Sequence, residues 1–175
     1  RFGANPVPLN IPIGDGQTFT GVVDLIEMKA INYAEDDGAN FDVTDIPDNM
    51  KDKVDEWRNH LLEEVSSNDE VLMEKYLEGE DIAIDELKVA IRKSCISGDI
   101  VPMLCGSAFK NKGVQSLLDY IIDFLPSPLD VGAIKGFDVD DKEKELERIP
   151  SNEAPFSALA FKIMTDPFVG RLTFF

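Results

Sequence analysis

The feature that most constrains the fold is an apolar stripe with the repeat of an α-helix. After Pro47, apolar residues recur three or four positions apart, at Met50, Val54, Trp57, Leu61 and Val65. At about 100° per residue, this spacing places all of them on one face of a helix. The stripe therefore predicts an amphipathic helix whose apolar face belongs to a core.

Strand-like segments precede this helix, and two more helices are expected to follow it. Apolar or alternating runs predict strands over 7–13, 19–26, 29–33 and 41–43. Ser67 and Glu70 have the spacing of a capping box, which predicts the start of the second helix. The third is predicted over 85–97, with Gly98 suited to end it.

The next segment has the pattern of a strand, a loop and a helix. An apolar run over 99–105 leads into Gly106-Ser107-Ala108, and a helical repeat covers 114–125. In open α/β sheets, ligands gather at the carboxyl ends of strands, so the loop 105–112 is where a binding site is expected. A buried strand followed by a Gly-Ser turn is also common without a ligand, and this pattern alone leaves both interpretations open.

Charge and composition narrow the function classes. The formal net charge is −17, which argues against direct binding of a nucleic acid backbone and favours basic partners, although solubility alone could account for it. No apolar run is long enough to span a membrane and no export signal is evident, so a soluble, cytoplasmic protein is expected. Cys95, Cys105 and the single His60 do not form a disulfide framework or a zinc pattern.

The two ends indicate a piece of a longer chain. Position 1 is Arg, and the sequence closes within the apolar run 172–175, which resembles an unfinished strand. An exposed connector is expected over 138–153, where charged residues dominate. The run 156–163 is apolar on both sides, which predicts a strand of a well-covered sheet.

Four strings of residues resemble bacterial-type elongation factor G, a translational GTPase, and the resemblance runs essentially from end to end. They are Gly3-Ala4-Asn5-Pro6-Val7-Pro8-Leu9, Phe19-Thr20-Gly21-Val22-Val23-Asp24-Leu25, Gly106-Ser107-Ala108-Phe109-Lys110-Asn111-Lys112-Gly113-Val114-Gln115 and Asp166-Pro167-Phe168-Val169-Gly170. The resemblance implies an α/β fold: the C-terminal part of a P-loop GTPase G domain with an α+β insert, followed by the first strands of a β-barrel.

The same resemblance implies a domain organisation. Its parts are a G-domain strand region (1–15), the G-prime insert (16–98), the last G-domain strand, loop and helix (99–126), a linker (127–154) and a truncated second domain (155–175). In this family, GTP hydrolysis with Mg²⁺ drives translocation of tRNA and mRNA on the ribosome during protein synthesis.

Gly106, Ser107 and Ala108 correspond in the family to the turn that contacts guanine through backbone amides and the serine hydroxyl. Guanine O6 accepts a hydrogen bond where adenine carries an amino group, so a backbone donor discriminates between the two bases. Lys110 and Asn111 are expected to be peripheral at most.

The phosphate-binding part of such a site is missing from the sequence. G-x-x-x-x-G-K-[ST], D-x-x-G and N-K-x-D occur nowhere in the 175 residues. We therefore expect no catalytic residue, no metal ligand and no measurable binding of GTP or GDP in this chain by itself, because the family's phosphate and Mg²⁺ contacts come from those motifs.

The family also implies a partner. The first long helix of its insert faces the basic C-terminal domain of the ribosomal stalk protein. Asp52, Glu56 and Glu63 lie opposite the apolar stripe, and Glu70 begins the next helix, so these four are the candidate partner-binding residues. A solvated helix face has the same pattern without a partner.

Three alternatives compete with this interpretation. A sister translational GTPase of the ribosomal-protection or release-factor type shares the Gly-Ser-Ala turn, but the first and last strings resemble elongation factor G more closely. The chain could also be a self-standing acidic interaction module. A hydrolase based on Glu63 and Glu64 lacks a nucleophile and a base around that pair.

Overall fold

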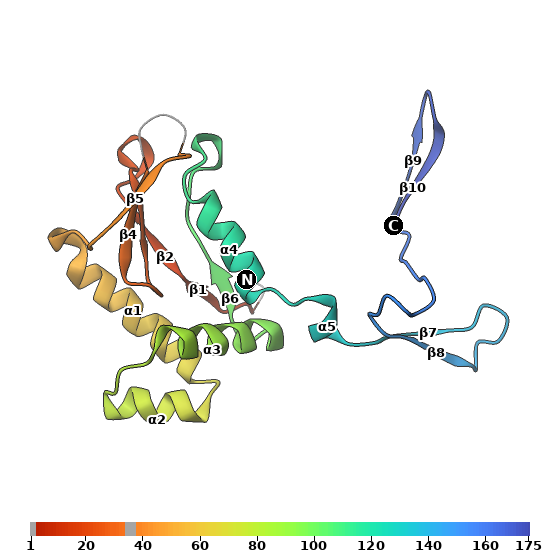
Figure 1. The fold of residues 1–175 in the computed structure, drawn as a ribbon, viewed down its shortest axis with the longest axis horizontal. Helices are drawn as coiled ribbons and strands as arrows, with labels where there is room; N and C mark the ends of the chain where they lie inside the picture. The colour runs from red at the N-terminus through yellow and green to blue at the C-terminus, as the bar shows by residue number, and fades with distance from the viewer. Residues whose placement is uncertain (1–2, 34–37) are drawn as a thin grey trace. The chain divides into compact units, whose positions relative to one another are not determined.

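The structure is a computed structural model that describes residues 3–33 and 38–175 (Figure 1). Its architecture is mixed α/β, with helices and several small sheets. The chain divides into two compact units, Arg1–Leu125 and Pro126–Phe175. No helix among the described residues combines the length and apolarity that a membrane span needs.

The strands of the first unit form two sheets. β1 (Pro6–Pro8) pairs in parallel with β6 (Val101–Met103). A four-stranded antiparallel meander follows, with the order β2 (Asn10–Ile13), β3 (Gly21–Asp24), β4 (Lys29–Tyr33) and β5 (Phe41–Thr44).

The prediction of one strand over 7–13 is wrong, because the chain changes sheets at Leu9. The Leu9 amide donates to the Met103 carbonyl at 2.9 Å, which extends the parallel pair by one bond. The Leu9 carbonyl accepts from the Leu25 amide, also at 2.9 Å, which begins the pairing of the meander. A single residue therefore serves both ladders, and the strand direction diverges there.

The helices of the first unit lie where the apolar repeats predict them. They are α1 (Lys51–Ser66), α2 (Glu70–Glu78), α3 (Ile84–Ser97) and α4 (Val114–Phe124), with short 3₁₀ turns η1 (Gly16–Thr18), η2 (Asp48–Met50) and η3 (Ala108–Lys110). The stripe on α1 is confirmed: Val54, Leu61 and Val65 are fully buried, and Trp57 packs against the core. Gly98 ends α3 in the left-handed conformation, as predicted.

The capping box predicted at Ser67 and Glu70 is wrong. Asp69 is the N-cap of α2, and its Oδ1 accepts from the amides of Val71 and Leu72 at 3.2 and 3.3 Å. Ser67 instead donates its hydroxyl to the Glu63 carbonyl at 2.8 Å and so completes the end of α1. Asp69 directly precedes the first turn of α2 and accepts from its free amides, so the N-cap position belongs to Asp69 and not to Ser67.

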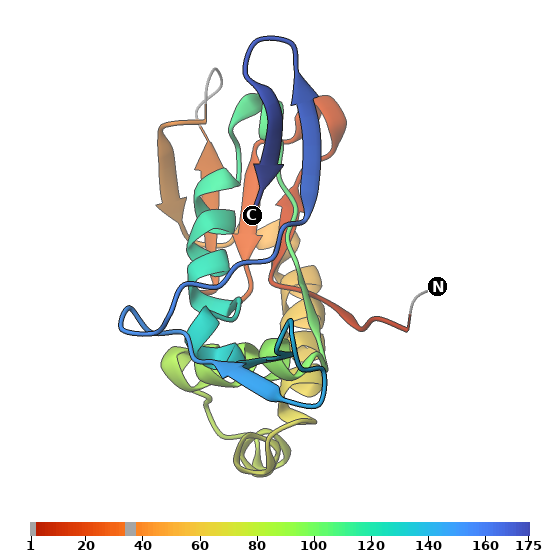
Figure 2. The same cartoon turned by 90° about the vertical axis from the view of Figure 1, so that its right-hand side faces the viewer.

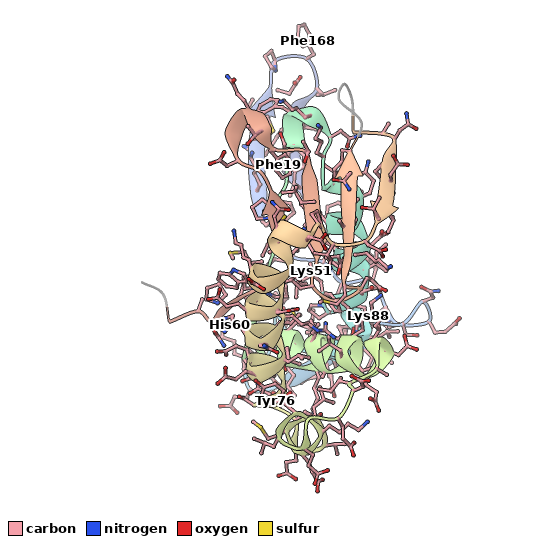
Figure 3. All side chains as sticks on the ribbon, turned by 90° about the vertical axis from the view of Figure 1, so that its left-hand side faces the viewer. Phe19, Lys51, His60, Tyr76, Lys88 and Phe168 are labelled. Atoms are coloured by element: carbon pink, nitrogen blue, oxygen red, sulfur yellow. The ribbon has the colours of Figure 1, made fainter. Side chains whose placement is uncertain are left out.

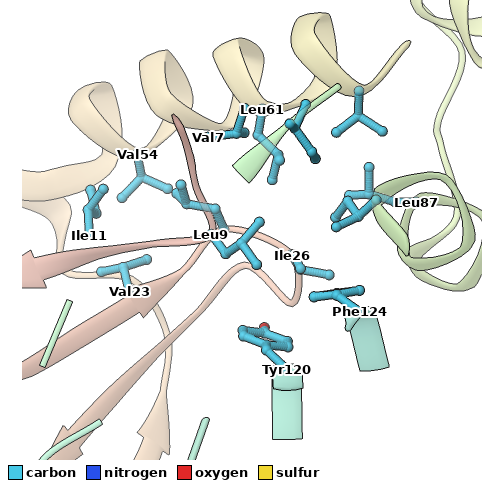
Figure 4. Close-up of a cluster of buried hydrophobic side chains, with 14 of the residues drawn as sticks. Val7, Leu9, Ile11, Val23, Ile26, Val54, Leu61, Leu87, Tyr120 and Phe124 are labelled. Atoms are coloured by element: carbon cyan, nitrogen blue, oxygen red, sulfur yellow. The ribbon is translucent and has the colours of Figure 1, made fainter. Parts of the chain in front are cut away.

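One apolar core joins these elements, with α1 and α4 on opposite sides of the strands (Figure 4). Leu9 and Val23 lie between the two helices, and every residue of β3 is buried. Figure 2 shows α4 along the strands from another side. Complete burial of each Leu, Ile or Val contributes about 1.5–3 kcal/mol to folding. The loop between β6 and α4 is thus attached at both ends to elements of this core.

The second unit consists of a short helix and two hairpins. These are α5 (Pro128–Val131), β7 (Ile134–Phe137) paired with β8 (Glu145–Arg148), and β9 (Lys162–Asp166) paired with β10 (Gly170–Phe174). A strand over 156–163 was predicted wrongly, since regular pairing begins only at Lys162. Within the described residues, Phe156 and Leu159 face no partner strand and are 82% and 80% exposed.

Candidate functional site

The loop predicted to contact guanine follows the carboxyl end of the parallel strand β6. Gly106, Ser107 and Ala108 lie between β6 and α4, and Ala108 begins η3. The strand and the helix both belong to the first unit. Figure 1 shows the loop at the end of α4 that lies farthest from α3.

Backbone hydrogen bonds close the loop into a tight turn. Ser107 and Lys112 form a bridge in which each amide donates to the other's carbonyl, at 2.8 and 3.0 Å. Asn111 completes the turn with φ 51°. A Cβ on Gly106 would lie 2.7 Å from the Lys112 carbonyl oxygen, so the turn requires glycine at this position.

Two amides of the predicted guanine-contacting turn are not used by the fold. The Ser107 amide is engaged by Lys112, whereas the amides of Gly106 and Ala108 donate no hydrogen bond among the described residues. The turn borders a hollow of about 180 Å³. It is lined by Leu104, Cys105, Gly106, Ser107, Ala108, Lys112, Gly113, Val114 and Leu117. The turn therefore offers backbone donors to an acceptor-bearing ligand.

Asn10 holds the strand that leads into this turn, a contact that the sequence reasoning missed. Its Oδ1 accepts from the Cys105 amide at 2.8 Å, and its Nδ2 donates to the Cys105 carbonyl at 3.4 Å. Burial raises the pKa of the Cys105 thiol, whose side chain is partly buried. No local pattern signals the pairing of Asn10 with Cys105, because they lie 95 positions apart in the sequence.

Gly38 supports the turn from the other side, and it was missed for the same reason. The Gln115 side chain donates from Nε2 to the Gly38 carbonyl at 3.1 Å. A Cβ on Gly38 would lie 2.4 Å from the Asn111 carbonyl oxygen, which shows how closely the two backbones approach. The loop is thus packed against residues of the predicted insert.

The four candidate partner-binding carboxylates are all exposed. Asp52, Glu56 and Glu63 lie on α1, opposite its buried stripe, and Glu70 is the first residue of α2. Among the described residues none of the four has an ion-pair partner within 4.0 Å. Figure 3 shows α1 at the front of the view, with Lys51 near its start and His60 in its second half.

Two lysines near this surface pair with other carboxylates. Lys51 pairs with Asp48 at 2.6 Å, and Lys93 pairs with Asp69 at 3.0 Å. The hydrogen bond from Lys93, followed by that from the Leu72 amide, lowers the pKa of Asp69. The four carboxylates, which we call the acidic surface, are not bonded to either of these two lysines.

Within residues 3–33 and 38–175, no cluster of three or more His, Cys, Asp or Glu side chains is arranged to hold a metal ion.

Comparisons with known proteins identify a structural relative. No model of a known protein family matches the chain. A crystal structure of a protein from Thermus thermophilus matches 96% of this chain with a TM-score of 0.70 and 25% sequence identity. The chain spans 22% of the length of that protein. The fold described above is thus one that also occurs as part of a much longer chain.

Proposed function

We propose that this chain is part of a translational GTPase of the elongation factor G type. It would supply the guanine-contacting end of the nucleotide site, the G-prime insert and the start of the second, β-barrel domain. The observation that carries the proposal is the turn after β6, where the amides of Gly106 and Ala108 have no acceptor among the described residues while the Ser107–Lys112 bridge closes the loop. The four strings that resemble elongation factor G support it independently.

The turn suits guanine for a specific chemical reason. Guanine O6 needs a donor, and a backbone N–H cannot rotate away or lose its proton. Adenine would present an amino group to the same donor and leave both groups unsatisfied, which disfavours its binding. The Ser107 hydroxyl adds a second polar group beside the base. Lys110 and Asn111, which follow the turn, would be at most peripheral to the site.

The proposal assigns the phosphate chemistry to other residues of the longer protein. Bound Mg²⁺ would neutralise charge on the phosphates, and the residues that hold it belong to motifs absent from this sequence. This chain would position the base and exclude water from one side of it. We therefore expect the isolated 175 residues to bind neither GTP nor GDP measurably and to show no hydrolysis.

A proline substitution tests the guanine contact with little risk to folding. Ala108→Pro removes one N–H that the fold does not use, at the first position of η3, where proline is accepted. Ser107 is extended, with φ −126° and ψ 96°, and so avoids the α region that a following proline disfavours. Ala108→Gly is the matched control, because it retains the N–H.

The measurement is a calorimetric titration of GDP into the longer protein that contains this chain. We expect Ala108→Pro to weaken GDP binding by about tenfold or more, the loss expected for one hydrogen bond in a desolvated site, and Ala108→Gly to have little effect. Equal affinities for all three proteins would refute a contact through the Ala108 amide and leave the Gly106 amide as the only free donor of the turn among the described residues. Wild-type protein that binds no guanine nucleotide would refute the proposed function as a whole.

A ribosome-based translocation assay separates the sister GTPases from the preferred proposal. A translocation factor advances tRNA and mRNA in the presence of GTP, whereas a ribosomal-protection or release-factor GTPase does not. Failure in that assay, combined with GTP hydrolysis on ribosomes, would favour a sister factor. A self-standing acidic module would fail both measurements.

The acidic surface supports a second part of the proposal, the binding of the basic C-terminal domain of the ribosomal stalk protein. Its carboxylates are exposed and have no ion-pair partner among the described residues, so a basic surface can approach without displacing other contacts. NMR shift mapping with the stalk domain should locate the contact on α1 and the start of α2.

Charge reversal tests this contact. Changing both Glu56 and Glu63 to Lys should weaken stalk-domain binding by about tenfold or more at low salt, because complementary surface charges are then replaced by like charges. The matched control reverses Glu143 and Glu153, two exposed carboxylates of the second unit, and should leave binding nearly unchanged. Equal binding by both variants would show that the acidic surface is a solvated helix face.

A further inference from the structure

The parallel pair β1–β6 loses its backbone partner just before the guanine-contacting turn. The register runs from Pro6 opposite Val101 to Pro8 opposite Met103, and the Leu9 amide adds one more bond to Met103. Beyond Leu9, the chain belongs to the meander, where Asn10 is opposite Asp24. Cys105, two residues after the end of β6, therefore has no neighbouring strand of this pair to hold it.

The side chain of Asn10 takes the place of the missing strand. A carboxamide carries one acceptor and one N–H donor group, the same pair that a peptide unit presents. Oδ1 accepts from the Cys105 amide and Nδ2 donates to the Cys105 carbonyl, so both backbone groups of Cys105 are bonded. Asn10 is only 4% exposed, and water does not compete effectively for these bonds.

We propose that Asn10 is a positioning residue for the guanine-contacting turn, and that it links the position of this turn to the sheet of the insert. Its side chain fixes Cys105, the residue directly before Gly106, while its backbone is paired with Asp24 in β3. A shift of β2 within the meander therefore moves the entry to the turn. The inference rests on the proposed function for its ligand and on the hydrogen bonds for its geometry.

The test replaces the carboxamide with an apolar side chain of similar size. Asn10→Leu removes both bonds to Cys105 without leaving a large cavity. Asn32→Leu is the matched control, because Asn32 lies in the same sheet and its side chain donates to the Thr44 hydroxyl, its one hydrogen-bond partner in the described part of the chain. Asn10→Asp retains the acceptor for the Cys105 amide and replaces Asn10→Leu if that variant does not fold.

The first readout is made on this chain itself by amide hydrogen exchange and NMR. In Asn10→Leu, we expect exchange at the Cys105 amide to accelerate at least about tenfold and the amide shifts of Gly106 and Ala108 to move, while Val54 and Leu61 in the core keep their shifts. Asn32→Leu should leave Cys105 unchanged. Unaltered exchange at Cys105 in Asn10→Leu, or equal loss of protection throughout the core, would overturn the positioning role.

The second readout is steady-state GTP hydrolysis by the longer protein. A turn that contacts the base equally in the ground and transition states affects KM and not kcat, so Asn10→Leu should raise KM about tenfold with kcat unchanged. An unchanged KM would contradict the inference, and so would a fall in kcat as large as the expected rise in KM. If the wild type neither binds nor hydrolyses GTP, the proposed function fails, and the exchange measurement on this chain still decides whether Asn10 positions the turn.

Discussion

Tyr120 on α4 makes a buried hydrogen bond whose removal should measurably destabilise the first unit. Its hydroxyl donates to Oδ2 of Asp24, while Oδ1 of the same carboxylate accepts from the amides of Ile26 and Glu27 at 2.8 and 2.9 Å. Tyr120 and Asp24 are 7% and 5% exposed. Tyr120→Phe removes the hydroxyl and keeps the ring, which stacks on Phe124 with centroids 5.2 Å apart.

The expected loss follows from the chemistry of that bond. A hydrogen bond to a charged group contributes about 1.5–3 kcal/mol, and the buried carboxylate loses one of its three donors. We therefore expect the free energy of unfolding to fall by about 2 kcal/mol. In a unit of this size, such a change lowers the midpoint of thermal unfolding by about 7 °C.

Urea and thermal unfolding followed by circular dichroism measure this loss. Tyr76→Phe is the matched control, because Tyr76 is only partly buried on α2 and its hydroxyl makes no hydrogen bond among the described residues. It should change stability by less than about 0.5 kcal/mol. A loss below about 0.5 kcal/mol for Tyr120→Phe would refute the argument that this bond joins α4 to the meander.

Three further predictions concern the same unit. Burial, followed by the charge of Asp24, raises the pKa of Tyr120 in the folded chain, so the tyrosine of the unfolded chain ionises at a lower pH. The free energy of unfolding should therefore fall as the pH rises above about 10. Thermal unfolding should show a less steep fall in Tyr120→Phe. Asp69→Ala removes the N-cap of α2 and should lower the free energy of urea unfolding by about 1 kcal/mol at about pH 7. Because the pKa of Asp69 is lowered in the folded state, the difference in stability between wild type and variant should disappear in acid, below that pKa. Gly106→Ala should cost about 1–3 kcal/mol because its Cβ meets the Lys112 carbonyl, whereas Gly136→Ala, with no atom within 4 Å, should cost little.

Local periodicity predicted most helices and strands of the first unit. The stripe on α1 repeats over 16 residues, and a face of that length has few alternatives to burial. The strands β4 and β5 were predicted almost to the residue, since short alternating runs between turns leave little freedom in where pairing ends.

The misses come from partners that are distant in the sequence. The division of 7–13 between two sheets depends on Met103 and Leu25, which bond to opposite sides of Leu9. The expected strand over 156–163 had the apolar composition of a sheet but pairs only from Lys162 onward. Composition indicates that a segment can pair, whereas a ladder requires another strand at the right distance.

The candidate site was predicted in part. The turn at Gly106, Ser107 and Ala108 lies at the end of a parallel strand, where the strand-loop-helix pattern placed it. The bridge to Lys112 engages the Ser107 amide and leaves the amides of Gly106 and Ala108 without an acceptor among the described residues. The sequence pattern did not predict this bridge. Asn10 and Gly38 reach the loop across long stretches of chain, so neither contact has a local signature.

The most direct test of the central claim is a crystal structure of the longer protein with GDP. The account predicts guanine against the turn after β6, with O6 within about 3 Å of the nitrogen of Ala108 or Gly106. A guanine base bound away from residues 106–108, or O6 satisfied entirely by other groups, would contradict it.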